Sequence, residues 1–261
     1  MKAYTRYADL EGRFVFISGG SSGIGAELVR AFAQQGAKVA LCGTRPGGGD
    51  ALAAELQAAG LPAPLYAACD VRDAPAYQAL LHGLIEQHGP VHVLVNNAGR
   101  DDRHRMEDVT PQFWDERIAL NLKHYFFAIQ ACAPAMADAG GGVVINMGSV
   151  SWMRGRPHLV GYTTAKAGIL GLTRTLAREL GARNIRVNAV VPGAIVTERQ
   201  TALHRDPAAD QAFLEAQCLK VRLDATHVAG VTLFMASQES SGMTGQHVLV
   251  DAGIAQQSVI S

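Results

Sequence analysis

The chain has 261 residues, 48% of them hydrophobic, and its formal net charge at pH 7 is zero. This length suits one large α/β domain and is too short for two generous ones. Because basic residues are not in excess, nothing in the sequence favours a nucleic-acid partner. No apolar run approaches the roughly 20 residues that cross a bilayer, so we expect no membrane partner either.

The N-terminus and the cysteines indicate a cellular compartment. Residues 1–16 lack the apolar stretch and small-residue cleavage site of a secretory signal. Four scattered cysteines show no C-x-x-C pair and no metal-binding spacing: Cys42, Cys69, Cys132 and Cys218. We therefore expect buried, reduced thiols, no metal site and a cytoplasmic location.

Short runs rich in Val, Ile and Leu alternate along the chain with longer helical segments. The runs predict strands at 13–18, 38–42, 63–68, 91–96, 142–147, 185–191 and 247–251. The helical segments lie at 23–36, 50–60, 75–89, 111–138 and 161–180, with two more pieces before the last strand. This alternation is typical of an α/β fold with a doubly wound parallel sheet, buried on both faces. We predict a single domain over residues 1–261.

One segment breaks the alternation. Residues 198–220 contain no expected strand and lie between the sixth and the last strands. We interpret this insertion as a loop and helix that form a lid over the substrate.

The segment "SGGSSGIG" (18–25) ends the first strand and opens the first helix. Glycines allow a tight turn and close approach of a ligand, and a helix N-terminus attracts a pyrophosphate. The spacing G-x-x-x-G-x-G differs from the standard dinucleotide fingerprint, but the strand before it and the helix after it support the same function. The candidate cofactor-binding residues of this turn are Gly19, Ser21, Ser22, Gly23 and Ile24.

The adenosine end of a dinucleotide is expected after the second strand. The chain has Gly43, Thr44 and Arg45 there and no carboxylate, which favours NADP or dual use with NAD. Arg45 can pair with a 2′-phosphate, although a solvated loop charge is an equal alternative. After the third strand, Asp70, followed by Val71, can accept from the adenine amino group or can cap the next helix.

Polar residues cluster at the predicted carboxyl ends of the fourth and fifth strands. The motif "NNAG" (96–99) offers Asn96 and Asn97 to hold backbone, and Gly99 clears space for a ring. Ser149 ends the fifth strand, and Tyr162 and Lys166 open the helix that follows. Asn121 is a polar residue within the apolar helix before that strand. In an open parallel sheet these residues can converge on one crevice.

These four polar residues suggest a site in which a general base removes the proton of a substrate hydroxyl. Free tyrosine has a pKa of about 10, and a fall of about three units requires about 4 kcal/mol of stabilisation. The Lys166 ammonium one helical turn away can supply this, Ser149 can donate to the substrate oxygen, and Asn121 can hold a water that links Lys166 to solvent. Each feature alone has a structural explanation, whereas their order at strand ends favours catalysis.

The segments "SGGSSGIG", "NNAG", "YTTAK" and "VVPGAIVT", with Asn121 and Ser149, resemble the short-chain dehydrogenase/reductase family over essentially the whole chain. The resemblance implies a Rossmann-type sheet of about seven strands with helices on both faces, a nicotinamide cofactor and a homotetramer. It implies a catalytic tetrad of Asn121, Ser149, Tyr162 and Lys166. It also implies cofactor contacts from Asn97, Ala98, Gly99, Tyr162, Lys166, Pro192, Gly193, Ile195 and Thr197.

Rarer segments, "NNAGRDDRH", "FWDERIALNL", "GSVSW" and "AQCLKVR", are similar to bacterial aldose 1-dehydrogenases of the D-xylose or L-arabinose type. This group oxidises C1 of an aldopyranose, of the L-arabinose, D-xylose, D-galactose or L-fucose class, to a lactone. The chain departs from the group at Arg100 and in residues 153–160. The expected pocket segments are polar and offer Asp101, Asp102, Arg103, His104, Trp152, Arg154, Arg156, His158 and Gln217. The substrate residues that we predict are Ser149, Trp152, Arg154, Tyr162 and Gln217, with Trp152 stacked on the sugar.

Two other functions remain open. Another dehydrogenase of the family, acting on a secondary alcohol or a 3-oxoacyl thioester, would carry the same motifs. A cofactor-sensing protein without catalysis is a more remote alternative, because the tetrad is intact.

Overall fold

In the residues that the structure describes, seven parallel strands form one central sheet, in the order β3-β2-β1-β4-β5-β6-β9. This computed structural model describes residues 2–197 and 207–256. The strands are β1 (Phe14–Ser18), β2 (Lys38–Gly43), β3 (Leu65–Ala68), β4 (Val93–Asn96), β5 (Gly142–Met147), β6 (Ile185–Pro192) and β9 (His247–Val250). Strand order reverses between β1 and β4, which is where a doubly wound sheet binds its ligand.

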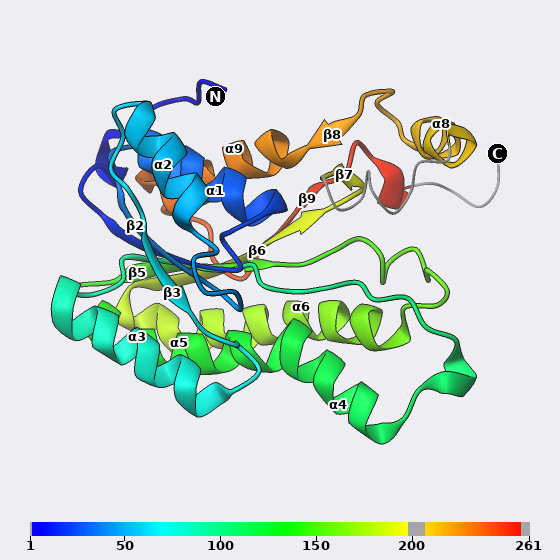
Figure 1. The fold of residues 1–261 in the computed structure, drawn as a ribbon, viewed down its shortest axis with the longest axis horizontal. Helices are drawn as coiled ribbons and strands as arrows, with labels where there is room; N and C mark the ends of the chain where they lie inside the picture. The colour runs from blue at the N-terminus through cyan, green and yellow to red at the C-terminus, as the bar shows by residue number, and fades with distance from the viewer. Residues whose placement is uncertain (1, 198–206, 257–261) are drawn as a thin grey trace.

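Helices cover both faces of the sheet (Figure 1). One layer contains α1 (Gly23–Gln34), α2 (Asp50–Ala58) and α9 (Ala225–Ala236); the other contains α3 (Ala74–His88), α5 (His124–Asp138) and α6 (Val160–Leu180). Consecutive residues of β1 serve opposite layers: Val15 and Ile17 pack against the first, Phe14 and Phe16 against the second. The predicted Rossmann-type fold, an α/β doubly wound sheet, is confirmed.

The predicted helix at 111–138 is not a regular α-helix throughout. It consists of α4 (Pro111–Ile118), a π-helical segment (Ala119–Lys123) and α5. The side-chain Nδ2 of Asn121 donates to the carbonyl of Arg117 at 3.0 Å, and this carbonyl is the one that a regular α-helix pairs with the Asn121 backbone. The side chain of Asn121 thus bonds the backbone acceptor at which the helix widens, and such π-helical turns are often found at functional sites.

The sequence also missed a short second sheet, in which β7 (Ile195–Val196) pairs with β8 (Leu223–Asp224). The predicted lid at 198–220 falls partly outside the described residues, because 198–206 are not described. Its later part forms α8 (Pro207–Ala216). Short 3-10 turns complete the described chain at Ala8–Leu10, Met106–Asp108, Gly181–Arg183, Gln238–Ser240 and Ile254–Gln256.

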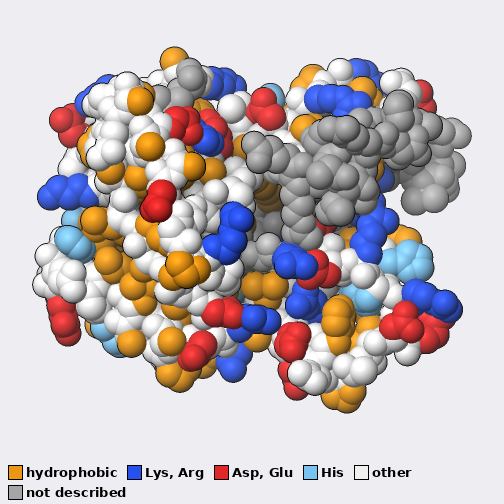
Figure 2. Space-filling view, viewed as in Figure 1, with side chains coloured by type: hydrophobic (Ala, Val, Ile, Leu, Met, Phe, Trp, Pro, Cys, Tyr) orange, Lys and Arg blue, Asp and Glu red, His pale blue; other side chains and the backbone are white. Residues whose placement is uncertain are grey.

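The face shown in Figure 2 carries positive and negative side chains intermixed. In the described part of the chain, no helix combines the length and the apolar character that crossing a membrane requires.

A row of fully buried polar side chains links two neighbouring strands to a helix. Asn96 on β4 and Asn146 on β5 are register partners, and Asn96 Nδ2 donates to Asn146 Oδ1 at 3.0 Å. Asn146 Nδ2 donates in turn to Thr173 Oγ1 on α6 at 3.0 Å. A buried amide that loses its partner is costly, so this row fixes α6 against the sheet.

We expect Thr173→Val to lower the free energy of unfolding by about 1–3 kcal/mol, because it leaves the Asn146 amide without its acceptor at unchanged side-chain volume. Urea denaturation followed by circular dichroism measures this change. Thr175→Val, on the exposed side of the same helix, is the matched control and should change the free energy little. Equal stability of the two variants would contradict the expectation.

Candidate active site

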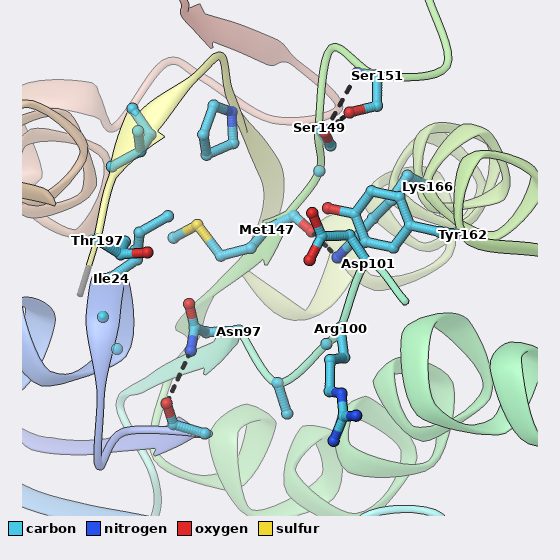
Figure 3. Close-up of a pocket in the computed structure, with 18 of the residues that line it drawn as sticks. Ile24, Asn97, Arg100, Asp101, Met147, Ser149, Ser151, Tyr162, Lys166 and Thr197 are labelled. Atoms are coloured by element: carbon cyan, nitrogen blue, oxygen red, sulfur yellow. Dashed lines mark hydrogen bonds between the residues drawn. The ribbon is translucent and has the colours of Figure 1, made fainter. Parts of the chain in front are cut away.

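A cavity of about 1010 Å³ opens at the carboxyl ends of the central strands. Its wall includes the turn between β1 and α1, the ends of β2, β4, β5 and β6, the start of α6 and part of α8. Figure 3 shows Ile24 and Thr197 on one side of the cavity and Ser149, Tyr162 and Lys166 across from them. The crevice that strand order predicts is therefore present, and residues from both of its sides share one cavity.

The glycine turn is packed too closely to accept side chains at two positions. Gly19 has φ +65°, and a Cβ there would lie 2.9 Å from Ala98 Cα. A Cβ on Gly25 would lie 2.1 Å from the carbonyl oxygen of Gly19. At the start of α1, Ser22 occupies the N-cap without a side-chain hydrogen bond. The first N–H groups of α1 therefore lack a side-chain cap, which fits a bound pyrophosphate.

Asn97 ties together the two strand ends that flank this crevice. Its Nδ2 donates to the carbonyls of Ser18 at 3.0 Å and Gly19 at 3.1 Å. The buried Ser18 Oγ accepts from the backbone N–H groups of Asn97 at 3.0 Å and Ala98 at 3.1 Å. The expectation that Asn97 holds backbone is confirmed, whereas Asn96 bonds the Asn146 side chain instead.

Of the predicted cofactor residues, all except Arg45 lie on the cavity wall. Gly43, Thr44 and Val71 line its adenosine end, while Arg45 is exposed and its carbonyl accepts from the Tyr66 hydroxyl. Arg45 directly follows the wall residues Gly43 and Thr44, and its pairing with a 2′-phosphate stays a prediction.

Asp70 also lines the cavity, but it does not cap the following helix. The N-cap of α3 is Asp73, whose carboxylate accepts from the Ala76 backbone N–H at 3.1 Å. Asp70 Oδ2 instead accepts from Arg72 Nη2 at 2.6 Å, and this hydrogen bond is the main cause of the lowered pKa of the Asp70 carboxyl. The capping alternative is thus wrong.

The four predicted catalytic residues come from three elements. Ser149 follows β5 and its Oγ donates to Ser151 Oγ at 3.0 Å; Tyr162 and Lys166 lie on the first turns of α6. Asn121 is fully buried, and its Oδ1 accepts from the Arg100 backbone N–H at 2.7 Å. Ser149, Tyr162 and Lys166 all line the cavity, whereas Asn121 supports it from behind.

Lys166 lies buried beneath the Tyr162 ring, with 3% of its surface exposed. Its Nζ lies 5.6 Å from the centroid of that ring. It donates to Tyr125 Oη at 3.0 Å and to the Met147 carbonyl at 2.8 Å. Burial lowers the pKa of Lys166 to about 7, so its charge is finely balanced near neutral pH.

Sequence reasoning missed two residues that support this arrangement. Tyr125 is fully buried, and its hydroxyl donates to the Met147 carbonyl at 3.0 Å while accepting from Lys166. His124 Nε2 hydrogen-bonds the Ala98 carbonyl at 3.1 Å, and burial lowers the pKa of His124 to about 3, so its imidazole stays neutral. Both follow Asn121 in "NLKHYFF", where they resemble ordinary core residues. The available signal was that an imidazole and a phenol in an apolar helix need hydrogen-bond partners.

The predicted substrate residues divide into two groups. Ser149, Arg154, Tyr162 and Gln217 line the cavity, as do three residues of the polar pocket segments: Asp101, Arg103 and Arg156. Trp152 is not on the wall, so its predicted stacking on a sugar has no support in this arrangement. Gln217 Nε2 is already bonded to the carbonyls of Leu219 and Val221.

The remaining polar residues of these segments serve the loop itself. Asp102 pairs with Arg117 and, at 2.6 Å, with Arg100. The His104 ring packs edge-on against Phe113, with 4.8 Å between ring centroids. The backbone N–H of His104 donates to the carbonyl of His158 at 3.0 Å. These residues therefore shape the rim and lie outside the cavity wall.

Comparisons with known proteins give a consistent set of relatives. Residues 19–255 match the family described as "Enoyl-(Acyl carrier protein) reductase". The chain is 48% identical to D-xylose 1-dehydrogenase of Caulobacter vibrioides over 95% of its own length and 97% of the relative. It is 44% identical to "Probable galactose dehydrogenase GalD" of Rhizobium meliloti, over 96% and 98% of the two chains. A 3-oxoacyl-[acyl-carrier-protein] reductase of Thermotoga maritima is 36% identical, over 94% and 98%.

Two solved structures are similar over most of their length. A blue fluorescent protein from a metagenomic library, in complex with NADPH, has a TM-score of 0.85 and 35% identity, covering 94% of this chain and 99% of that one. A 7α-hydroxysteroid dehydrogenase, complexed with NADH and 7-oxo glycochenodeoxycholic acid, has a TM-score of 0.88 and 30% identity, covering 94% of each.

We expect Tyr125→Phe to lower the pKa of Lys166 further, by about one unit, because the ammonium loses an acceptor that stabilises its charged form. NMR titration of protein labelled with ¹³C at lysine Cε measures this pKa directly. Tyr77→Phe removes the hydroxyl of another fully buried tyrosine and should leave the Lys166 titration in place. An unchanged titration in Tyr125→Phe would show that its hydroxyl does not stabilise the ammonium.

Proposed function

Because this chain belongs to the short-chain dehydrogenase/reductase family, we propose that it is a nicotinamide-dependent sugar 1-dehydrogenase. It would oxidise the C1 hydroxyl of an aldopyranose, of the L-arabinose, D-xylose, D-galactose or L-fucose class, to the aldonolactone. The observation that carries the proposal is the Tyr162 phenol above a buried Lys166 whose pKa is about 7, at the strand ends and across the cavity from an uncapped helix N-terminus. The two sugar dehydrogenases among the relatives support this substrate class.

The residues of the cavity fit a nicotinamide dinucleotide. The uncapped start of α1 offers free N–H groups to the diphosphate, the close packing at Gly19 and Gly25 fixes the turn before it, and Asn97 ties the end of β1 to the loop after β4. Thr44 and the absence of an acid after β2 favour NADP, with NAD as a second cofactor. The bound cofactor supplies the hydride acceptor.

The chain's own residues handle the proton. Ser149 Oγ, now bonded to Ser151, can turn to donate to the C1 oxygen of the substrate. That hydrogen bond places the hydroxyl beside Tyr162, which takes its proton as general base. The Lys166 ammonium beneath the ring favours the phenolate, and Tyr125 with the Met147 carbonyl holds the ammonium in place.

Asn121 is proposed to act mainly as a support. Its Oδ1 accepts from Arg100 and its Nδ2 donates to the Arg117 carbonyl, so both ends of the amide are engaged. It thereby connects the loop after β4 to the π-helical segment. The predicted water relay from Lys166 through Asn121 remains a prediction.

We also propose that the protein is a cytoplasmic homotetramer. Phe126 on α5 and Val160 at the start of α6 are 40% and 43% exposed, and association through these helices would remove both side chains from water. Light scattering that shows a stable monomer would contradict the assembly.

Initial rates with a panel of aldoses, with NADP and NAD, test the proposed reaction. We expect turnover of at least one aldopyranose to its lactone and a higher kcat/KM with NADP. A 3-oxoacyl thioester and simple secondary alcohols are the competing substrates in the same assay. Turnover of those, and of no aldose, would refute the sugar reaction while leaving the family in place.

Tyr162→Phe should lower kcat by about 10²- to 10⁴-fold, because the general base is lost while the ring remains. Cofactor binding, followed by NADPH fluorescence, should change little. Tyr7→Phe, outside the cavity wall, serves as the control and should keep full activity. If the biological activity of the protein in the cell is unchanged in Tyr162→Phe, the alternative of a cofactor-sensing protein without catalysis would be favoured.

A further inference from the structure

Two arginines on the segment after β5 face the cavity together. Arg154 and Arg156 both line it, and their guanidinium carbons lie 5.6 Å and 5.2 Å from the ring centroid of Phe213 on α8. Arg103, from the loop after β4, lines the same cavity. Side chains from three separate segments thus bring positive charge and an aromatic ring to one place.

In the described part of the chain, the three arginines outnumber the carboxylates on this part of the cavity wall, where the acidic residue is Asp101. Neither Arg154 nor Arg156 forms an ion pair there, and the acidic wall residues are Asp70, at the adenosine end, and Asp101. Burial, followed by the charges of Arg103 and Arg154, lowers the pKa of Arg156, while Asp101 raises it. The guanidinium groups of these arginines repel one another. An anion bound between them would reduce this repulsion and would itself be attracted by each group.

The arginines lie at the reacting end of the cavity. The backbone N–H of Arg154 donates to the Val150 carbonyl at 3.2 Å, and that of Arg156 donates to the Ser151 carbonyl at 3.2 Å. These bonds fold the segment back beside Ser149. Figure 3 shows Ser149 and Ser151 across the cavity from Ile24 of the glycine turn. The arginines are therefore placed to contact the substrate, whereas the cofactor diphosphate is expected at the glycine turn.

We propose that the preferred substrate is an aldose that carries an acidic group, a carboxylate or a phosphate, at the end of the sugar remote from C1, and that Arg154 and Arg156 bind this group. The proposal rests on the proposed sugar 1-dehydrogenase function and names its substrate class. Guanidinium groups bind carboxylate and phosphate oxygens through paired hydrogen bonds. A neutral pentose or hexose offers hydroxyls but no charge to offset the cluster. The acidic group takes no part in the chemistry, which remains the oxidation of C1.

Matched substrate sets test this proposal: D-galactose, D-galacturonate and D-galactose 6-phosphate, and the corresponding three D-glucose compounds. We expect kcat/KM for at least one anionic member to exceed that of its neutral parent by roughly tenfold or more at low salt. The carboxylate and phosphate arms identify which acid the site accepts. The preference should shrink as NaCl is raised, because salt screens the attraction.

The variant Arg154→Leu/Arg156→Leu should abolish the preference, through a rise in KM for the anionic sugar of roughly tenfold or more. Its kcat/KM for the neutral sugar should fall much less than that for the anionic sugar, because a neutral sugar offers no charge for the guanidinium groups to bind. Arg105→Leu is the matched control, because Arg105 is exposed and pairs with Glu107. Phe213→Leu keeps both charges and should retain the preference even if α8 packs less well.

Two results would overturn the proposal. One is a neutral aldose turned over as well as its anionic partners by the wild-type protein. The other is a double variant that loses neutral and anionic turnover equally, which would assign the arginines a packing role against Phe213.

If no aldose is turned over, the proposed function fails, and calorimetric titration with D-galacturonate decides the anion site independently. Tighter binding of D-galacturonate to the wild-type protein than to the double variant would support the anion site, and equal binding to both would reject the site.

Discussion

The contact on which the site depends is the one between the Lys166 ammonium and the two oxygens that surround it. Burial removes water from the Lys166 ammonium and destabilises its charged form, and this is why the pKa of Lys166 falls to about 7. The Tyr125 hydroxyl and the Met147 carbonyl replace part of that water with fixed acceptors. Since Met147 ends β5, the sheet itself sets the position of the charge beneath Tyr162.

The two sides of the cavity differ in composition and in the function that we propose for each: one for the cofactor and the other for the substrate. The side formed by the β1–α1 turn is made of backbone and small residues, because close approach matters more there than side-chain chemistry. The opposite side carries the phenol, the serine and the arginines. Asn97 ties the loop after β4 to the end of β1, and His124 ties the same loop to α5, so this loop is held at both of these elements.

The amino-acid pattern predicts the fold and the shared catalytic group well, because both depend on local rules. Seven apolar runs, a glycine turn after the first, and a tyrosine and lysine one turn apart determine which elements form and where they meet. The π-helical segment could not be predicted, because the apolar periodicity of residues 111–138 is that of a continuous helix and does not show that the Asn121 side chain bonds the Arg117 carbonyl. The partner of Asp70 could not be chosen from the sequence either, because its carboxylate could cap the next helix or bind Arg72, and the structure shows the bond to Arg72.

The pairing of Asn96 with Asn146 has a consequence for how the sheet assembles. Parallel strands made of continuous Val, Ile and Leu can slide past each other with little change in buried apolar area. Two amides that match only in one alignment make every slipped arrangement leave a polar group stranded in the interior. This pair therefore fixes the register of β4 against β5 at the centre of the sheet. In that register the ends of the two strands lie level beneath the ligand crevice.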